Sequence, residues 1–518
     1  MHSPLLRGRG APVSSVEPDP MNRLDRRLVG AGGLSVPHGP ARVFPERIIQ
    51  FGEGNFLRGF ADWMVDHLNA AGMFEGSVAV VQPVRQGLAE LLNEQDGVYT
   101  LLLRGIQNGE RVGERRVVTS ISRCLNPYED WASVVGIATR PELRFAISNT
   151  TEAGIAHVAE AYDGQHSPAS FPAKVTALLW ERFKALGGSA ESGLVFLPCE
   201  LIDRNGAKLR EHVLRHAAEW NAGDDFIAWI ESANHFLNTL VDRIVPGYPG
   251  KEAEALREEL GYDDRLMVAA EIFHLWVIEG PAHLAKEIPF HEAGLNVVWT
   301  EDMTPYRSRK VRVLNGAHTA TVPAAFLAGL NTVGEMMDDP DFGPLVRRAV
   351  FDEILPVLDM DDAGKRDYAS AVLERFRNPF IRHELLSITL NSISKWRVRV
   401  LPSLLDSLER NGTLPPLLTF SLAAWIRFYD GRPVSETELQ GNRGGLAYPV
   451  RDDAPVLAFF AGAWSEFHGS NDLAKLTHSV LSNTKLWGRD LTLVAGLQQA
   501  VEESLGRILT DGARKSIP

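Results

Sequence analysis

The sequence predicts an α/β protein, with an N-terminal Rossmann-like doubly wound sheet followed by a mostly α-helical C-terminal domain. Three observations support this prediction. Short apolar segments that are typical of buried strands alternate with helix-like segments from Arg47 to about residue 200. A glycine-containing turn, 52–58, lies where the first apolar segment passes into a helix. From about Arg210 onward, apolar residues recur mainly with the 3.6-residue period of helices.

The candidate strands of the first half are short and rich in Val, Ile, Leu and Phe. They cover 47–51, 77–82, 98–104, 115–121, 143–148 and 193–198. Helix-like segments, such as the one that ends near Ala71 and the one over 172–186, separate several strands, so we expect a largely parallel sheet. Asn108-Gly109 is a typical hairpin turn and predicts an antiparallel insertion between the third and fourth strands.

The second half of the chain is predicted to be helical. The candidate helices cover 264–277, 314–330, 344–354, 367–376 and 417–429. A short strand, 295–299, is expected to close the first domain, and the Gly- and Asn-rich stretch 431–453 to form a long surface loop. The predicted regions are a disordered extension over 1–40, a dinucleotide-binding domain over 41–290 and a substrate and catalytic domain over 291–518.

Composition narrows the classes of partner. A net charge of -13 argues against a nucleic-acid or anionic-membrane surface, and no apolar run reaches the roughly 18 to 20 residues that span a bilayer. Cys124 and Cys199 form neither a disulfide framework nor a CxxC metal pair. We therefore expect a cytoplasmic protein that acts on a small molecule without a metal ion, and the oligomeric state stays open.

The segment Lys310-Val-Arg-Val-Leu-Asn315-Gly-Ala-His318 is the strongest candidate for chemistry. On an α-helix its lysine, asparagine and histidine lie within roughly 140° of one another, so they can converge on one ligand. A buried lysine can act as a general acid or base, an amide can hold a developing alkoxide, and an imidazole can orient a hydroxyl. The alternative is a helix with a solvent-facing lysine and a core histidine.

The turn Gly52-Glu-Gly54-Asn-Phe-Leu-Arg58 has the context in which backbone N–H groups approach a pyrophosphate. Leu57 replaces the third glycine of the usual pattern, and the second strand ends at Gln82 instead of an acidic residue, with Arg85 nearby. We expect NAD as the cofactor, without excluding NADP.

A second polar loop, 148–154, follows another strand, where small polar residues can line the nicotinamide end of the cofactor. A plain connecting loop is the alternative. The residues predicted to bind the cofactor are Phe51, Gly52, Glu53, Gly54, Asn55, Phe56, Arg58, Thr151 and Glu152.

These segments together resemble the mannitol dehydrogenase family of polyol-specific long-chain dehydrogenases. The shared marks are the glycine turn, the Thr151-Glu152-x-Gly154 loop, Asp242-Arg243-Ile244, the lysine segment and Arg375-Phe-x-Asn378-Pro379. The resemblance covers residue 45 to the C-terminus. It implies metal-independent hydride transfer between NAD and a secondary alcohol or ketone. Lys310 would be the catalytic acid/base, and Asn315 and His318 would hold the reacting oxygen.

Several segments are most similar to family members that act on sugar acids, which implies D-altronate and D-tagaturonate, in hexuronate catabolism, as the expected pair. Arginine suits such a carboxylate because its guanidinium binds in bidentate fashion. The residues predicted to bind substrate are Asn205, Arg375, Arg382 and His383.

One position departs from the family pattern. Leu201 stands where many members carry an asparagine that binds the oxyanion, and Asn205 either replaces that asparagine or only shapes a turn. The alternatives left open are the mannonate/fructuronate pair, the mannitol/fructose pair and a non-catalytic dinucleotide sensor.

Overall fold

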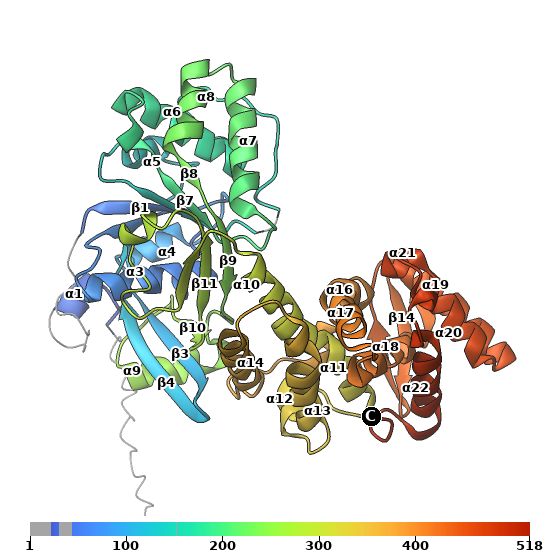
Figure 1. The fold of residues 1–518 in the computed structure, drawn as a ribbon. Helices are drawn as coiled ribbons and strands as arrows, with labels where there is room; N and C mark the ends of the chain where they lie inside the picture. The colour runs from blue at the N-terminus through green and yellow to red at the C-terminus, as the bar shows by residue number, and fades with distance from the viewer. Residues whose placement is uncertain (1–21, 31–43, 152) are drawn as a thin grey trace, which may run out of the picture.

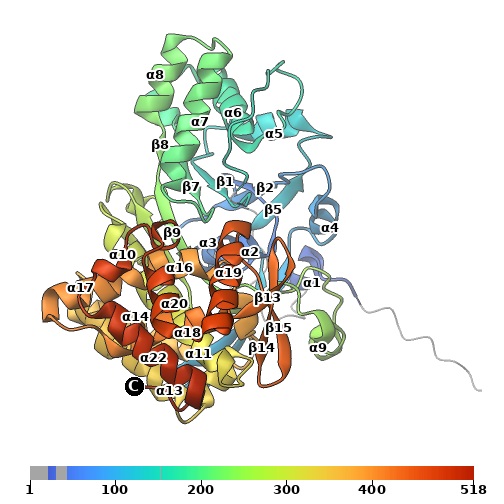
Figure 2. The ribbon, with the colours of Figure 1, turned by 90° about the vertical axis from the view of Figure 1, so that its right-hand side faces the viewer.

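The computed structural model describes residues 22–30, 44–151 and 153–518. In Figure 1 the blue-to-green chain builds sheets flanked by helices, and the orange-to-red chain builds a helical half beside them. Figure 2 shows the same halves with the helical half toward the viewer. The predicted fold class is therefore confirmed.

The main sheet has six parallel strands in the order β5-β2-β1-β6-β7-β8. Their bounds are β1 (Glu46–Phe51), β2 (Ser77–Val81), β5 (Ile121–Leu125), β6 (Phe145–Ser148), β7 (Val195–Pro198) and β8 (His235–Phe236). The order reverses between β1 and β6. Because ligands of open α/β sheets bind outside the carboxyl ends of strands at such a reversal, this edge is the expected crevice.

Both faces of the sheet are covered. Ile48 of β1 packs into a core that includes α3 (Ala61–Ala70), and the next residue, Ile49, packs into a core with α5 (Trp131–Ala138) and α6 (Phe171–Leu186). The remaining helices of this half are α2 (Asn55–Arg58), α4 (Ala89–Glu94), α7 (Asn205–Glu219), α8 (Asp224–Ala233) and α9 (Ala253–Leu260). The alternation of core residues along β1 explains why the successive residues Ile48 and Ile49 are both apolar.

Two small sheets join the first half to the second. β3 (Tyr99–Gln107) and β4 (Glu110–Val118) form the predicted antiparallel hairpin, with Asn108 and Gly109 both at positive φ, and β10 (Val268–Glu271) pairs with β3 in parallel. The other sheet has the order β12-β11-β9, from β9 (Asn238–Asp242), β11 (Leu275–Glu279) and β12 (Val297–Thr300). The predicted strand over 295–299 is thus confirmed as β12.

The helical half packs around one large apolar core that contains α11 and α18. Its helices are α10 (Thr304–Arg309), α11 (Gly316–Leu327), α12 (Val333–Asp338), α13 (Phe342–Arg348), α14 (Asp362–Phe376), α15 (Leu385–Ile388), α16 (Ser392–Arg399), α17 (Leu401–Asn411), α18 (Pro416–Phe428), α19 (Ala454–Ser470), α20 (Leu473–Leu481), α21 (Thr484–Trp487) and α22 (Leu497–Asp511), with π-helical turns η4 (Lys310–Asn315) and η5 (Ala349–Ile354). Four of the five predicted helices are found here.

Two predictions of secondary structure were wrong. The segment 264–277 forms β10 and most of β11 instead of a helix, because the apolar spacing of a short, mostly apolar segment does not distinguish a buried strand from a buried helix. The segment 431–453 holds an antiparallel sheet, β13 (Gly431–Ser435), β14 (Glu438–Arg443) and β15 (Leu446–Val450). Gly444 and Gly445, both at positive φ, form its second turn, a pair typical of tight hairpins.

Part of the predicted disordered extension is folded. Residues 22–30 include the helix α1 (Arg26–Gly30), and Leu24 and Val29 are buried against Val98 and Tyr262. The burial of these two apolar side chains is the physical reason for the difference. The rest of 1–40 lies outside the described residues.

Among the described residues, no helix is both long enough and apolar enough to pass through a bilayer.

Candidate active site

The lysine segment is helical throughout, but its geometry differs from the expected α-helix. Lys310 to Asn315 form a π-helical turn between α10 and α11. Because π-helical hydrogen bonds join residues five positions apart, this turn brings Lys310 and Asn315 toward one face of the helix. Lys310 and Asn315 are half-buried, and no described group hydrogen-bonds to the Asn315 carboxamide. A free amide thus lies one π-turn from the amine.

Lys310 reaches out of its helix toward the end of β9. Its Nζ donates a hydrogen bond of 2.7 Å to the carbonyl oxygen of Val241. Burial lowers the pKa of Lys310 below its ordinary value, although the carboxylate of Asp242 acts against burial, and Arg375 lowers it further. The amine is therefore easier to deprotonate than that of a surface lysine.

A buried network lies beside this lysine and joins the two halves of the molecule. Arg375 of α14 forms bidentate hydrogen bonds to Asp242 at the end of β9, at 2.9 and 3.1 Å, and to Glu271 at the end of β10, at 2.9 and 2.7 Å. The Tyr368 hydroxyl donates to Asp242 at 2.9 Å, and the ring of Phe273 lies 4.2 Å from the guanidinium carbon. Arg375 therefore connects the helical half to the sheet-containing half.

The network shifts the pKa values of its two acids in opposite directions. Burial alone would raise the pKa of Asp242, but Arg375 and Lys310 bring it below its usual value. For Glu271, burial dominates and raises the pKa. Asp242 is therefore the carboxylate that faces Lys310 as a stable negative charge.

His318 lies in α11, within the apolar interior of the helical half. Its ring stacks on Phe376 with centroids 3.9 Å apart, and His383 meets it edge-on at 5.3 Å. Its Nε2 is buried without a hydrogen-bond partner among the described residues. Burial holds the pKa of His318 well below its ordinary value, so the imidazole is neutral at physiological pH and can orient a hydroxyl without carrying charge.

The predicted arginine ligands are placed differently from the expectation. Arg375 is engaged by two carboxylates, so most of its donors are already used. Arg382 has a side chain that is 78% exposed and pairs with Glu384 at 2.6 Å. His383 is half-buried in a small cavity with His318 and Phe376, and no described group hydrogen-bonds to its ring.

Asn205 is fully occupied by backbone groups. Its Nδ2 donates to the carbonyls of Pro198, Glu200 and Thr239, and its Oδ1 accepts from the backbone N–H groups of Gly206 and Thr239. With these bonds made, Asn205 shapes the turn between β7 and α7, and the described structure leaves it no donor for an oxyanion. Leu201 is 66% exposed at the same turn.

The glycine turn is built as a close backbone approach. Gly52 has φ of +119°, and a Cβ there would lie 2.9 Å from the carbonyl oxygen of Asn149. A Cβ at Gly54 would meet no atom within 4 Å, so open space lies beside this residue at the carboxyl end of β1. A ligand can therefore approach the protein backbone closely at Gly54.

The other residues of the turn mostly support it. Arg58 is buried and donates to the carbonyls of Glu53 and Leu266 and to Asn55 Oδ1. Phe51 is buried against Phe171, and Phe56 stacks on Phe60. Arg58 thus stabilises the turn through its hydrogen bonds to Glu53 and Asn55.

Glu200 was missed by the sequence analysis and organises the second polar loop. Its carboxylate accepts from Ser148 Oγ at 3.0 Å, and from Thr150 through the backbone N–H at 2.9 Å and the hydroxyl at 3.0 Å. Thr151 is exposed at φ of +73°, and Glu152 lies outside the described residues. An acidic residue directly after a buried strand was the only signal for this role.

The chain is similar to known proteins over most of its length. The family of the mannitol dehydrogenase Rossmann domain matches residues 46–292, and that of the mannitol dehydrogenase C-terminal domain matches residues 302–509. Altronate oxidoreductases from Cronobacter sakazakii and Yersinia enterocolitica are 48% and 46% identical over 483 and 480 residues, each covering 92% of this chain and 97% of the relative.

Two solved structures share the fold. A substrate-free D-sorbitol dehydrogenase aligns with a TM-score of 0.77 at 22% identity, over 96% of this chain and 100% of its own. The Pseudomonas fluorescens mannitol 2-dehydrogenase, in a ternary complex with NAD and D-mannitol, aligns with a TM-score of 0.65 at 23% identity, over 96% and 98%.

The buried network generates a stability prediction. Arg375→Met should lower the free energy of unfolding by about 3–5 kcal/mol at neutral pH, because two carboxylates stay buried without their counter-charge. The deficit should shrink as pH falls, since both acids are then protonated more easily than in the native chain. Urea unfolding at several pH values measures this.

Arg382→Met is the matched control. This exposed arginine forms only a surface pair, so its loss should change the free energy of unfolding by about 0.5 kcal/mol or less. Equal effects of the two substitutions would contradict the assignment of Arg375 as the connection between halves.

Proposed function

The chain belongs to the mannitol dehydrogenase family, and we propose that within it this protein is an NAD-dependent oxidoreductase that interconverts D-altronate and D-tagaturonate in hexuronate catabolism. The proposed location is the cytoplasm, in keeping with two buried cysteines that form no disulfide. Relatives that are 46–48% identical over nearly their whole length carry the name altronate oxidoreductase, which favours this sugar acid over neutral polyols.

The observation that carries the proposal is the pairing of a half-buried amine with a free amide. Lys310 is oriented by Val241 and balanced by Asp242, and Asn315 lies one π-turn away with an unused carboxamide. A lysine that only covers a helix surface would extend into solvent and would not contact a strand end and a buried carboxylate. Amine and amide together suit an oxygen that gains and loses charge during a reaction.

The residues at the end of β1 fit a dinucleotide. Gly54 leaves open space where a pyrophosphate can approach backbone N–H groups, and Gly52 permits the tight turn. The carboxylate of Glu53 lies against the loop after β2, where it accepts from the N–H of Leu88 at 3.4 Å. Burial raises the pKa of Glu53, but an acidic side chain at this place still disfavours a 2′-phosphate, which supports NAD over NADP.

In this proposal the nicotinamide, when bound, supplies hydride to the keto carbon or accepts it from the carbinol carbon. Lys310 as an ammonium donates a proton to the substrate oxygen during reduction, while Asn315 Nδ2 donates a hydrogen bond to it. During oxidation, neutral Lys310 takes the proton from the hydroxyl group. Loss of one oxyanion donor commonly costs on the order of 3 kcal/mol.

His318 and His383 complete the proposed site as neutral groups. Burial lowers the pKa of both imidazoles, so each can accept or donate one hydrogen bond to a substrate hydroxyl. With Arg375 engaged and Arg382 at the surface, His383 keeps a free side chain next to His318. We propose that His383 contacts the sugar acid. Arg375 does not contact it and instead acts on Lys310, by binding Asp242 and lowering the pKa of the lysine.

A substrate panel tests the proposed activity. NADH oxidation, followed by absorbance, should be fastest with D-tagaturonate and much slower with D-fructuronate and D-fructose at equal concentrations. Fastest turnover of D-fructuronate or D-fructose would replace the proposed substrate. Binding of NADH without turnover of any of the three would favour the dinucleotide sensor.

Lys310→Met should abolish turnover in both directions while NADH binding stays within about twofold, because the amine serves the proton and not the cofactor. In the native enzyme, oxidation should fall as pH drops, since protonation removes the base. Because burial lowers the pKa of Lys310, this fall should occur at a lower pH than the one, about 10.4, at which an ordinary lysine takes up its proton. Rates over a pH series measure it, and substantial turnover by Lys310→Met would refute the role.

The glycine turn makes a separate prediction about the cofactor. Gly54→Ala should weaken NADH binding about tenfold or more while leaving the free energy of unfolding nearly unchanged, because the methyl group projects into open space that a pyrophosphate would use. Gly52→Ala should instead destabilise the fold by about 1–3 kcal/mol through backbone strain. Fluorescence titration and urea unfolding separate the two effects; unchanged NADH affinity in Gly54→Ala would place the cofactor elsewhere.

A further inference from the structure

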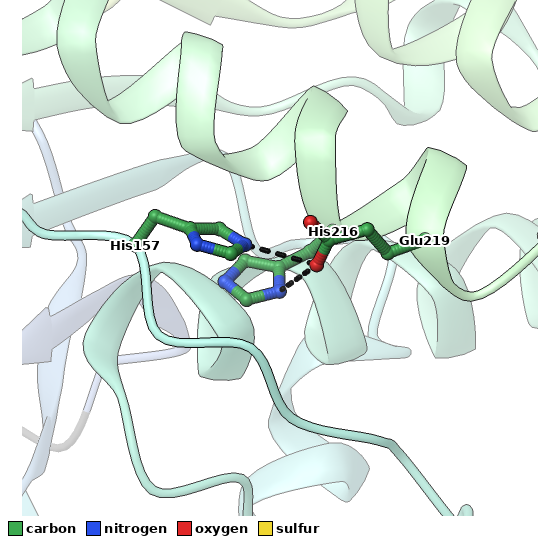
Figure 3. A group of neighbouring side chains, drawn as sticks. All are labelled: His157, His216 and Glu219. Carbon is green, nitrogen blue, oxygen red and sulfur yellow. Dashed lines mark hydrogen bonds and ion pairs between the residues drawn. The ribbon is translucent and has the colours of Figure 1, made fainter.

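A cluster of metal-ligand side chains lies away from the lysine segment. His216 and Glu219 are one turn apart near the end of α7, and His157 faces them from a segment without helix or strand that follows the second polar loop. Figure 3 shows the three side chains converging, with both imidazoles beside one carboxylate oxygen. In Figure 1, α7 lies in the upper part of the molecule and α14 in the lower part.

The distances within this cluster suit a shared ion. His157 Nε2 lies 2.9 Å and His216 Nδ1 lies 4.0 Å from the same oxygen, Glu219 Oε2. One ligand atom from each residue lies within 4.8 Å of the others, and the two imidazole rings stack with centroids 4.7 Å apart. Arg215 binds the other carboxylate oxygen at 2.9 Å, which leaves Oε2 directed at the imidazoles.

A second observation points to a missing ligand. His216 is completely buried, yet neither of its ring nitrogens has a hydrogen-bond partner among the described residues. His212, one turn earlier on α7, likewise has a buried Nδ1 without a partner, and its ring centroid lies 6.3 Å from that of His157. Buried polar groups are nearly always satisfied, so this concentration of unpaired imidazole nitrogens requires an explanation.

We propose that His157, His216 and Glu219 bind one divalent transition-metal ion, best matched by Zn²⁺. Imidazole nitrogen and carboxylate oxygen are its common ligands at about 2.0–2.2 Å, which places ligand atoms roughly 3.4 Å apart around a tetrahedral ion. The ion would therefore separate His157 Nε2 from Glu219 Oε2 slightly and draw His216 Nδ1 toward that oxygen. A water molecule or His212 completes the fourth position. The metal ion would supply a partner for the ring of His216, and it would replace the hydrogen bond between His157 and Glu219.

The consequence of this site is structural. The ion ties the irregular segment that carries His157 to α7, and the polar loop held by Glu200 lies immediately before that segment. Bound metal would therefore restrain the chain that leaves the crevice. It takes no part in the proposed proton transfer by Lys310. The sequence analysis predicted no metal site because His157 is far from the other two residues along the chain.

Metal binding to the full-length protein tests this site directly. After treatment with EDTA and removal of the chelator, the chain is titrated with Co²⁺, whose visible absorption intensifies on tetrahedral coordination, and then with Zn²⁺ in competition. We expect one equivalent to bind. Glu219→Gln and His157→Asn should each weaken binding at least tenfold, and Zn²⁺ should raise the thermal unfolding midpoint of the native chain but not of these variants.

The variants avoid the completely buried His216, so a folding defect does not confuse the result. His166→Asn is the matched control, because His166 lies on the same segment but is exposed and paired with Asp163. It should leave affinity unchanged. Absence of stoichiometric binding, or binding that survives both Glu219→Gln and His157→Asn, would overturn the proposal and leave a hydrogen-bonded His–Glu pair. Neither readout depends on the enzymatic activity.

Discussion

One buried arginine holds the two halves of this protein in register. Arg375 comes from α14 of the helical half and inserts its guanidinium between Asp242 and Glu271, each at the end of a strand of the sheet-containing half. Two bidentate contacts on adjacent edges of one planar group, which share Nη2, fix both distance and orientation. The lysine segment and the glycine turn belong to the two halves that this contact joins.

The same network sets the electrostatics of Lys310. Burial lowers the pKa of Lys310 and favours the neutral amine. The carboxylate of Asp242 raises this pKa, whereas the positive charge of Arg375 lowers it. Because burial lowers the pKa of Lys310, its amine releases a proton more readily than that of a surface lysine. That property suits an oxidoreductase proposed to work reversibly, because each direction needs a different protonation state of one group.

The sequence predicted what depends on local pattern and missed what depends on distant contacts. Four strands of the main sheet (β1, β2, β6 and β7), the Asn108-Gly109 hairpin and most helices of the second half follow from periodicity and turn residues, whereas β5 and β8 were missed. The segment 264–277 was misassigned because an apolar run does not distinguish a strand from a helix, and this error hid Glu271 at a strand end. The π-turn at Lys310 has no sequence signature that periodicity can detect, although the residue types in it pointed to the site.

Side-chain roles were hardest to assign where a residue type fits two tasks. Arginines near Asn378 were expected to meet a substrate carboxylate, yet Arg375 meets two carboxylates of the protein itself. Likewise, the amide of Asn205 donates to three carbonyls, which belong to the end of β7, the turn after it and β9, and Leu201 offers no polar atom beyond the backbone. In the proposed mechanism Asn315 is therefore the amide that donates to the oxyanion, beside Lys310. A site with one amide donor in place of two must rely more strongly on the ammonium, which makes the position of Asp242 beside it the decisive feature of this chain.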